Sequence, residues 1–264
     1  MTSGKGGVGK TALAANLGIA FSLKGQRVVV FDADLGLANL DVLLGIKAEF
    51  TLQHVLDGTT SLPEALIEGP GGIRIVAGGS GVGKLLRISR KRLQEFLLQV
   101  AELESSTDIL MFDTASGADA HVMTFARCAD QVLLVATPDP ASILDAYATA
   151  KVLLRHKPDA FIRVILNLVT EEAQARRVFS AMQAITQRFL DKDLYYGGCV
   201  RQDPRVTHWT RLSKPFLLAE PKSPASRDVA ALAANLAVQP AERTGDSVAE
   251  RIQAAFGMAQ REAA

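Results

Sequence analysis

The sequence predicts an α/β protein built on a single doubly wound, mostly parallel β-sheet flanked by helices. Three observations predict it. Short apolar runs of strand length alternate with longer helical patterns along the 264 residues. Hydrophobic residues make up 48% of the chain but aromatic residues only 6%, which suits a core of aliphatic side chains around buried parallel strands. A glycine-rich run also comes directly before the first helical pattern.

The alternation can be followed from one end of the chain to the other. Apolar periodicity predicts helices over residues 11–23, 90–104, 142–156 and 171–190. Continuous apolar runs predict buried strands over residues 28–31, 73–76, 109–112, 131–136 and 163–168.

No repeat of fixed period and no internal linker interrupts the chain before residue 239. We therefore expect one domain over residues 1–238. Residues 239–264 are expected to form a polar linker and a short amphipathic C-terminal helix.

Composition excludes several classes of protein. Basic and acidic residues nearly cancel, 29 against 28, which argues against a polyanion binder, so no specific nucleic-acid binding is predicted. Cys128 and Cys199 lie far apart, and the four histidines are scattered, so neither residue type has metal-ligand spacing. No apolar run is long enough to span a bilayer. We expect a cytoplasmic protein that is at most peripheral on the inner face of the cell membrane.

The first chemical motif is the glycine-rich run. It satisfies G-x-x-x-x-G-K-[ST], in which backbone N–H groups form an anion nest and the following helix N-terminus adds a positive field. Lys10 is expected to reach the β- and γ-phosphates of a nucleotide, and the Thr11 hydroxyl to ligate Mg²⁺. The predicted nucleotide-binding residues of this run are Gly4, Lys5, Gly6, Gly7, Val8, Gly9, Lys10, Thr11 and Ala12.

Two further features qualify this motif. Gly78–Lys84 repeats the glycine spacing, but Leu85 follows where a Mg²⁺-binding hydroxyl belongs, so a loop near the site is favoured over a second nucleotide pocket.

A phosphate loop also needs a strand that runs into it, and only Met1–Ser3 precede the glycines. Either the chain starts late or the sheet lacks its central strand. We expect a truncated first strand.

Acidic residues follow two of the predicted strands. Ligands of open α/β sheets bind at the carboxyl ends of strands, where Asp32, Asp34 and Asp113 lie. A single aspartate there is most often a solvated turn or a helix cap, but three beside a phosphate loop favour function. Thr11, Asp32 and Asp113 are the predicted Mg²⁺ ligands. Asp34 is predicted to orient the attacking water.

Taken together, Lys5–Thr11, Asp32–Asp34 and Asp113–Thr114 resemble the MinD/ParA (SIMIBI, deviant Walker A) class of P-loop ATPases, over residues 3 to about 235. The resemblance implies ATP/ADP and Mg²⁺ as cofactors and an ATP-dependent homodimer. In this class a signature lysine, matched here by Lys5, crosses to the phosphates of the partner subunit. The resemblance therefore makes Lys5 catalytic, together with Lys10, Asp34 and Asp113.

Within this class, residues 31–41, 78–81 and 136–147 resemble the FlhG branch (FleN, YlxH) of regulators of flagellar number and placement. The resemblance implies partners such as a FleQ-type transcription activator, the FlhF GTPase or flagellar switch proteins. It also implies that Asn167 and the segment containing Val200, Arg201 and Asp203 contact the adenine base.

The sequence also departs from this branch. Asp113–Gly117 differs from the usual D-T-G-A-G, Arg201–Gln202 replaces a usual proline, and the branch's amino-terminal D-Q-A-x-x-L-R segment is absent. The alternatives are a ParA-like partitioning ATPase, which needs a basic surface, and a MinD-type regulator of cell division. An iron–sulfur carrier needs clustered cysteines, which the chain lacks. A ligase of the dethiobiotin synthetase type is disfavoured by Lys5.

The C-terminal helix offers a membrane hypothesis. Val248, Ile252 and Phe256 lie on one face of residues 247–262, where they would insert into lipid in a reversible membrane contact. The alternatives are that the same face docks on the body of the protein, or that the helix is a frayed terminus.

Overall fold

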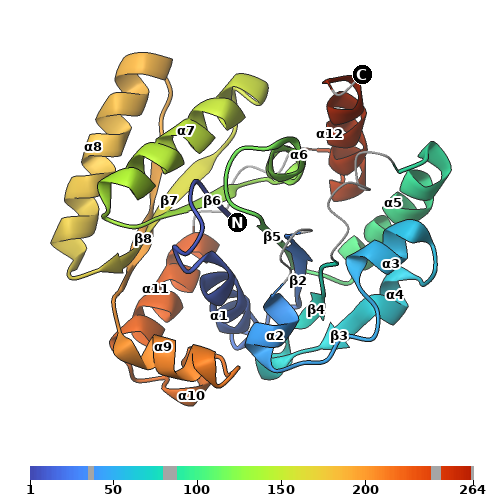
Figure 1. Ribbon diagram of the computed structural model, residues 1–264, viewed down its shortest axis with the longest axis horizontal. Helices are drawn as coiled ribbons and strands as arrows, with labels where there is room; N and C mark the ends of the chain where they lie inside the picture. The colour runs from blue at the N-terminus through green and yellow to red at the C-terminus, as the bar shows by residue number, and fades with distance from the viewer. Residues whose placement is uncertain (35–38, 80–87, 239–244, 263–264) are drawn as a thin grey trace.

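The strands of this computed structural model form a mostly parallel central layer covered by helices on both faces (Figure 1). The structure describes residues 1–34, 39–79, 88–238 and 245–262. Its strands are β1 Thr2–Ser3, β2 Val28–Ala33, β3 Leu66–Glu68, β4 Arg74–Val76, β5 Ile109–Thr114, β6 Val132–Ala136, β7 Ile162–Val169 and β8 Tyr195–Arg201. All five predicted strands are confirmed.

Helices join the strands in the order expected of a doubly wound fold. They are α1 Lys10–Ser22, α2 Leu40–Leu44, α3 Leu52–Asp57, α4 Leu62–Ala65, α5 Arg90–Ser105, α6 Ala120–Cys128, α7 Pro140–His156, α8 Glu172–Leu190, α9 Pro204–Arg211, α10 Phe216–Ala219, α11 Pro224–Val238 and α12 Val248–Glu262. A 3₁₀ turn, Pro70–Gly72, precedes β4.

Hydrogen-bonded pairing divides the central layer into two halves. One half has the strand order β3-β4-β2-β5 and the other β1-β6-β7-β8, and among the described strands only the β3–β4 pair is antiparallel. The halves meet at the first residues of the chain, where Ser3 forms a parallel bridge with Ser116. The N-terminus accordingly lies in the middle of the fold, between β5 and β6 (Figure 1). The first strand is thus only two residues long.

Register aligns the ends of the strands at one edge of the layer. Asp32 on β2 pairs with Asp113 on β5. On the other half, Asn167 of β7 pairs with Val200 of β8. Because parallel strands end at the same edge, these side chains collect beside the loop that leads into α1.

The C-terminal helix exists where the sequence predicts it, but its apolar face is not free for lipid. Ile252 and Phe256 are fully buried in a cluster with residues of α5 and α6, and Val248 packs against the same cluster. Phe256 meets Phe125 edge-on, with ring centroids 6.3 Å apart. The face predicted to enter the membrane therefore packs on the body of the protein in this structure. Burying Ile252 and Phe256 there removes apolar surface from water, which stabilises the docked helix.

Polar contacts hold the same helix at its start. Arg251 donates to the carbonyl of Cys128 at 2.7 Å and pairs with Asp130 at 3.2 Å. Glu104 accepts from the backbone N–H of Val248 at 3.0 Å. No helix in the described part of the chain is long and apolar enough to cross a membrane.

Candidate nucleotide site

The glycine loop between β1 and α1 has a backbone that only glycine allows at three positions. Gly7 and Gly9 have φ of +78° and +80°, in the region that other residues avoid. A Cβ on Gly4 would lie 2.1 Å from the backbone of Asp145. The loop is therefore fixed by its glycines, and it ends where α1 begins at Lys10.

The first turn of α1 suits an anion. It contains no acidic residue, and Gly9 at its N-cap makes no side-chain cap bond. Thr11 and Ala12 are half-buried in this turn, and Gly6 and Gly7 are exposed in the loop ahead of it. Backbone N–H groups of the loop and the helix dipole favour a phosphate here.

Lys10 and Asp113 form the most buried ion pair of the site. The lysine Nζ lies 2.7 Å from Asp113 Oδ1, and the two side chains are 8% and 0% exposed. The second oxygen, Asp113 Oδ2, is buried without a hydrogen-bond partner in the described structure. A buried carboxylate oxygen without a partner is costly. Together with the Thr11 hydroxyl, it is an oxygen donor of the kind that Mg²⁺ prefers, so these residues fit the ion.

Asp32 organises the loop that follows β2. Its oxygens accept backbone N–H groups of Asp34 at 3.1 Å, Asn39 at 2.9 Å and Leu40 at 3.0 Å. Burial, together with the nearby charge of Asp113, raises the pKa of Asp32 to about 6 against the opposing effect of the three N–H donors. The structure thus assigns Asp32 a positioning role that sequence reasoning did not give it, while its role as a Mg²⁺ ligand stays a prediction.

Two predicted parts of the site lie at the border of the described residues. Asp34 is half-buried, and residues 35–38 after it lie outside them. The second glycine run, Gly78–Lys84, is described only at Gly78 and Gly79. Its assignment as a loop near the site stays a prediction.

Lys5 pairs with an acidic residue at the start of α7. Its Nζ lies 3.5 Å from Asp139 Oδ2, and the two side chains are 48% and 51% exposed. Asp139 also caps α7 by accepting the backbone N–H of Ser142 at 3.0 Å. Sequence reasoning missed Asp139 as the partner of Lys5. The available signal was an acid directly before Pro140, a common N-cap arrangement.

Asn167 ties the far half of the sheet to the phosphate loop. Its Nδ2 donates to the carbonyl of Val8 at 2.8 Å, and both residues are buried. The next residue, Leu168, has φ of +58°, and the register between β7 and β8 shifts there. Such a bulge redirects a side chain at a strand end. Asn167 therefore positions the loop, and its contact with a base stays a prediction.

The second predicted base segment lies beside it at the end of β8. Val200 is buried, and Arg201 pairs with Asp228 of α11 at 2.8 Å, half-exposed. Asp203 caps α9 by accepting the backbone N–H of Arg205 at 3.0 Å, and its Oδ2 is buried without a partner in the described structure. The guanidinium of Arg201 is thus engaged with Asp228, which leaves Asp203 as the better placed polar group for a ligand.

This arrangement is chemically suited to a nucleoside triphosphate. The loop and Lys10 face the place where phosphates bind, while Thr11 and Asp113 supply oxygen donors. No group of three or more histidine, cysteine or acidic side chains in the described part of the chain could hold a metal alone. A divalent ion here would therefore share its coordination with phosphate oxygens, as Mg²⁺ does in phosphoryl-transfer sites.

Comparison with known proteins agrees with this geometry. Residues 1–216 match the family described as the CobQ/CobB/MinD/ParA nucleotide binding domain. The chain is 39% identical to the antiactivator FleN of Pseudomonas aeruginosa, over 86% of this chain and 81% of that protein. It is 34% identical to the flagellum site-determining protein YlxH of Helicobacter pylori, over 81% of this chain and 72% of that protein.

A solved structure shows the same fold. The septum site-determining protein MinD of Pyrococcus horikoshii, complexed with Mg-ADP, superposes with a TM-score of 0.71 at 25% identity, over 88% of this chain and 95% of that one. The buried Lys10–Asp113 pair and the glycine loop thus lie in a fold that carries nucleotide in a relative. The chain belongs to the MinD/ParA family of nucleotide-binding ATPases, with the flagellar regulators FleN and YlxH among its relatives.

Proposed function

We propose that this protein is an ATP-dependent dimerisation switch whose slow ATP hydrolysis regulates flagellar number or placement through partner proteins. The observation that carries the proposal is the position of Lys5. About half of its side chain is exposed, and among the described residues its ammonium pairs with Asp139 at a loose 3.5 Å. A lysine so placed can leave Asp139 and reach the phosphates of a second subunit, where positive charge stabilises the transition state.

The cofactors we propose are ATP/ADP and Mg²⁺. The glycine loop would cradle the phosphates, Lys10 would neutralise their charge, and Thr11 and Asp113 would hold the ion, which polarises the terminal phosphate when bound. Asp32 accepts the backbone N–H of Asp34, and this contact would help hold Asp34 where it orients the attacking water. The support for this assignment is the unpartnered Asp113 Oδ2 and the Mg-ADP complex of the relative.

The in-trans role of Lys5 is tested by Lys5→Ala. We expect this variant to bind ATP with nearly unchanged affinity but to hydrolyse it at least about tenfold more slowly, since only a charge needed in the transition state is lost. Affinity is measured with a fluorescent ATP analogue and turnover by phosphate release. Lys24→Ala, at an exposed lysine beyond α1, is the matched control and should keep wild-type turnover. Wild-type turnover in Lys5→Ala would refute the proposed role.

For the flagellar role, we propose that partners dock on an apolar groove between α7 and α8. The groove has a volume of about 540 Å³ and exposes Leu144, Ile185 and Phe189. Pro140 lines one end of it and follows Asp139, so the groove is continuous with the residue that holds Lys5. Exposed apolar patches of this kind mark protein interaction sites. The occupant we propose is a flagellar regulator, such as a FleQ-type activator.

Phe189→Asp tests this surface, because a charge in an apolar groove opposes docking. We expect the variant to lose binding of the FleQ-type activator while ATP turnover stays at the wild-type rate. Binding is measured by size-exclusion chromatography of the two purified proteins with ATP and with ADP. Leu98→Asp, at an exposed leucine of α5, is the control and should bind normally. Normal binding by Phe189→Asp would refute this docking surface.

The localisation we propose is cytoplasmic. Reversible contact with the inner membrane face is proposed only for a state in which α12 has left the body. The reason is that Ile252 and Phe256 are buried while it is docked.

A further inference from the structure

The segment that follows β5 contains a serine that the proposed nucleotide site does not yet include. Ser116 lies three residues beyond Asp113, in the run Asp113–Gly117 that departs from the usual D-T-G-A-G. An alanine stands at the position of Ser116 in that usual pattern. The side chain of Ser116 therefore brings a hydroxyl group that the motif itself does not supply.

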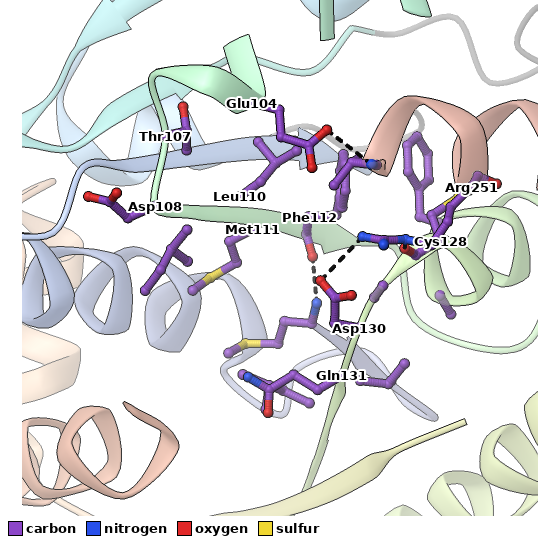
Figure 2. A pocket seen from close by; sticks show the side chains of 18 of the residues that line it. Glu104, Thr107, Asp108, Leu110, Met111, Phe112, Cys128, Asp130, Gln131 and Arg251 are labelled. Carbon is purple, nitrogen blue, oxygen red and sulfur yellow. Dashed lines mark hydrogen bonds and ion pairs between the residues drawn. The ribbon is translucent and has the colours of Figure 1, made fainter. Parts of the chain in front are cut away.

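The strand β5 holds this segment in place. Phe112 packs against Phe31 of β2 and against Phe125 of α6, with ring centroids 5.4 and 5.2 Å apart. Figure 2 shows Leu110 and Phe112 along this strand. The last four residues of the strand, Met111–Thr114, are buried. Because such packing leaves little freedom, the point at which the segment leaves the sheet is fixed.

Hydrogen bonds join the same segment to the start of the glycine loop. Ser3 and Ser116 form a parallel bridge, and the backbone N–H of Gly117 donates to the carbonyl of Ser3 at 2.7 Å. The Ser3 hydroxyl in turn donates to the carbonyl of Lys5 at 3.0 Å. These contacts hold the segment and the loop in a defined position relative to each other.

The Ser116 hydroxyl lies against the tip of the glycine loop. A Cβ on Gly6 would lie 3.7 Å from Ser116 Oγ, and among the described residues no other atom beyond the chain neighbours of Gly6 would come within 4 Å. Gly6 and Ser116 are both exposed, and the hydroxyl has no hydrogen-bond partner in the described part of the chain. A hydroxyl that is free to bind a ligand therefore lies where the loop is open to solvent.

We propose that the Ser116 hydroxyl donates a hydrogen bond to the terminal phosphate of a bound nucleoside triphosphate, and that it helps the site to distinguish a triphosphate from a diphosphate. The inference rests on the proposed assignment of ATP/ADP and Mg²⁺ to this site. It adds a residue whose contact depends on the last phosphate alone.

The position of Ser116 favours the terminal phosphate over the inner ones. The inner phosphates bind the N–H groups at the start of α1, at the end of the loop that leads to Lys10. In phosphoryl-transfer sites Mg²⁺ bridges the last two phosphates, and Asp113 is a proposed ligand of this ion. Ser116 follows Asp113 on the same segment and lies beside Gly6, ahead of the phosphate-binding turn of the helix. The phosphate nearest to it is therefore the last one.

Ser116→Ala tests this contact through the affinities for two nucleotides. We expect the affinity for the non-hydrolysable triphosphate AMP-PNP to fall by about tenfold, because a hydrogen bond to a charged group is lost. The affinity for ADP should change by less than about twofold. Both are measured with Mg²⁺ by displacement of a fluorescent ADP analogue. The protein is kept at a concentration where size-exclusion chromatography shows a monomer with either nucleotide, so that dimerisation does not contribute.

Two further variants separate the hydroxyl from the shape of the loop. Ser116→Thr keeps the hydroxyl at an exposed position and should bind AMP-PNP within about threefold of wild type. Ser180→Ala, at an exposed serine of α8, is the matched control and should bind both nucleotides normally. An equal loss in Ser116→Thr and Ser116→Ala would show that the hydroxyl is not the group that acts, and would overturn the proposal.

The remaining outcomes are equally decisive. Unchanged AMP-PNP affinity in Ser116→Ala would overturn the contact, and equal losses for AMP-PNP and ADP would show a disturbed loop instead. In both cases wild-type binding of the two nucleotides leaves the proposed site intact, so the failure concerns Ser116 alone. A wild-type protein that binds neither nucleotide would overturn the site, and this contact with it.

Discussion

Lys10 and Asp113 are the residues on which the site depends most, because both are charged and buried. Two buried charges at 2.7 Å attract strongly, but each would be costly alone. We expect Asp113→Asn to lower the free energy of unfolding by about 3–5 kcal/mol in the absence of nucleotide. It would leave the Lys10 ammonium without its counter-charge. Urea unfolding of the nucleotide-free protein measures this.

Glu172→Gln is the matched control for that variant. Glu172 pairs with Arg176 at 2.6 Å on the surface of α8, where both side chains are exposed. Exposed pairs contribute at most about 1 kcal/mol. If Asp113→Asn loses no more stability than Glu172→Gln, the buried pair does not have the energetic role that its geometry implies.

The sequence predicted some of these residues, but not all of their roles. Lys10 and Asp113 were both predicted from the sequence. The glycine-rich motif places Lys10 at the start of a helix, and Asp113 follows the apolar run of a predicted strand. The ion pair between Lys5 and Asp139 was not predicted. These residues are 134 positions apart in the sequence, and the fold brings the glycine loop to the start of α7. Asp32 was predicted as a metal ligand, whereas its contacts with the backbone N–H groups of Asn39 and Leu40, seven and eight residues along the chain, follow from the fold and not from a local pattern.

At the scale of the element, α12 depends on one aromatic side chain. The side chain of Phe256 is fully buried among core residues. We expect Phe256→Ala to cost about 3–5 kcal/mol of unfolding free energy, because the cavity it leaves cannot be filled. Urea unfolding is the measurement. Met258→Ala, at an exposed residue of the same helix, should change stability by no more than about 0.5 kcal/mol. A Phe256→Ala protein as stable as wild type would mean that α12 is undocked in solution.

The same helix shows what a sequence pattern cannot predict. Periodicity identifies an apolar helix face but not what covers it, so lipid and the protein body stayed open as alternatives. β8 was missed because Gly197 and Gly198 weaken a strand pattern. A Cβ on Gly197 would meet Ile165 of β7 at a tight 3.1 Å, and Gly198 has φ of +135°, a backbone conformation that other residues rarely adopt. Packing between segments that lie far apart in the sequence explains both gaps.

At the scale of the whole molecule, the alternation of apolar runs and helical patterns was enough to predict the doubly wound fold. It did not predict that pairing would divide the sheet at β5 and β6. The residues Met1–Ser3 contact both halves, through pairings with distant segments that no local pattern contains. The N-terminus is therefore a structural joint between the halves.

This position makes stability depend on pH through the Met1 amino group. Burial lowers its pKa from 8.0 to about 5, and the nearby Lys10 lowers it too, although Asp113 opposes the shift. Between these pH values the unfolded chain binds more protons at this group than the folded protein does. Its contribution to stability therefore rises as pH rises from about 5 to about 8, and is lost as pH falls through that window.

Comparison with an Nα-acetylated form isolates this effect, because acetylation removes the titrating charge but keeps an N–H at Met1. Urea unfolding of both forms at about pH 5.5 and about pH 8 should show that the unmodified protein gains more stability with pH than the acetylated one. Other titrating groups contribute equally to both forms and cancel in the difference. Identical gains would show that the amino group is hydrated in solution, and that the two halves of the sheet are not closed around it.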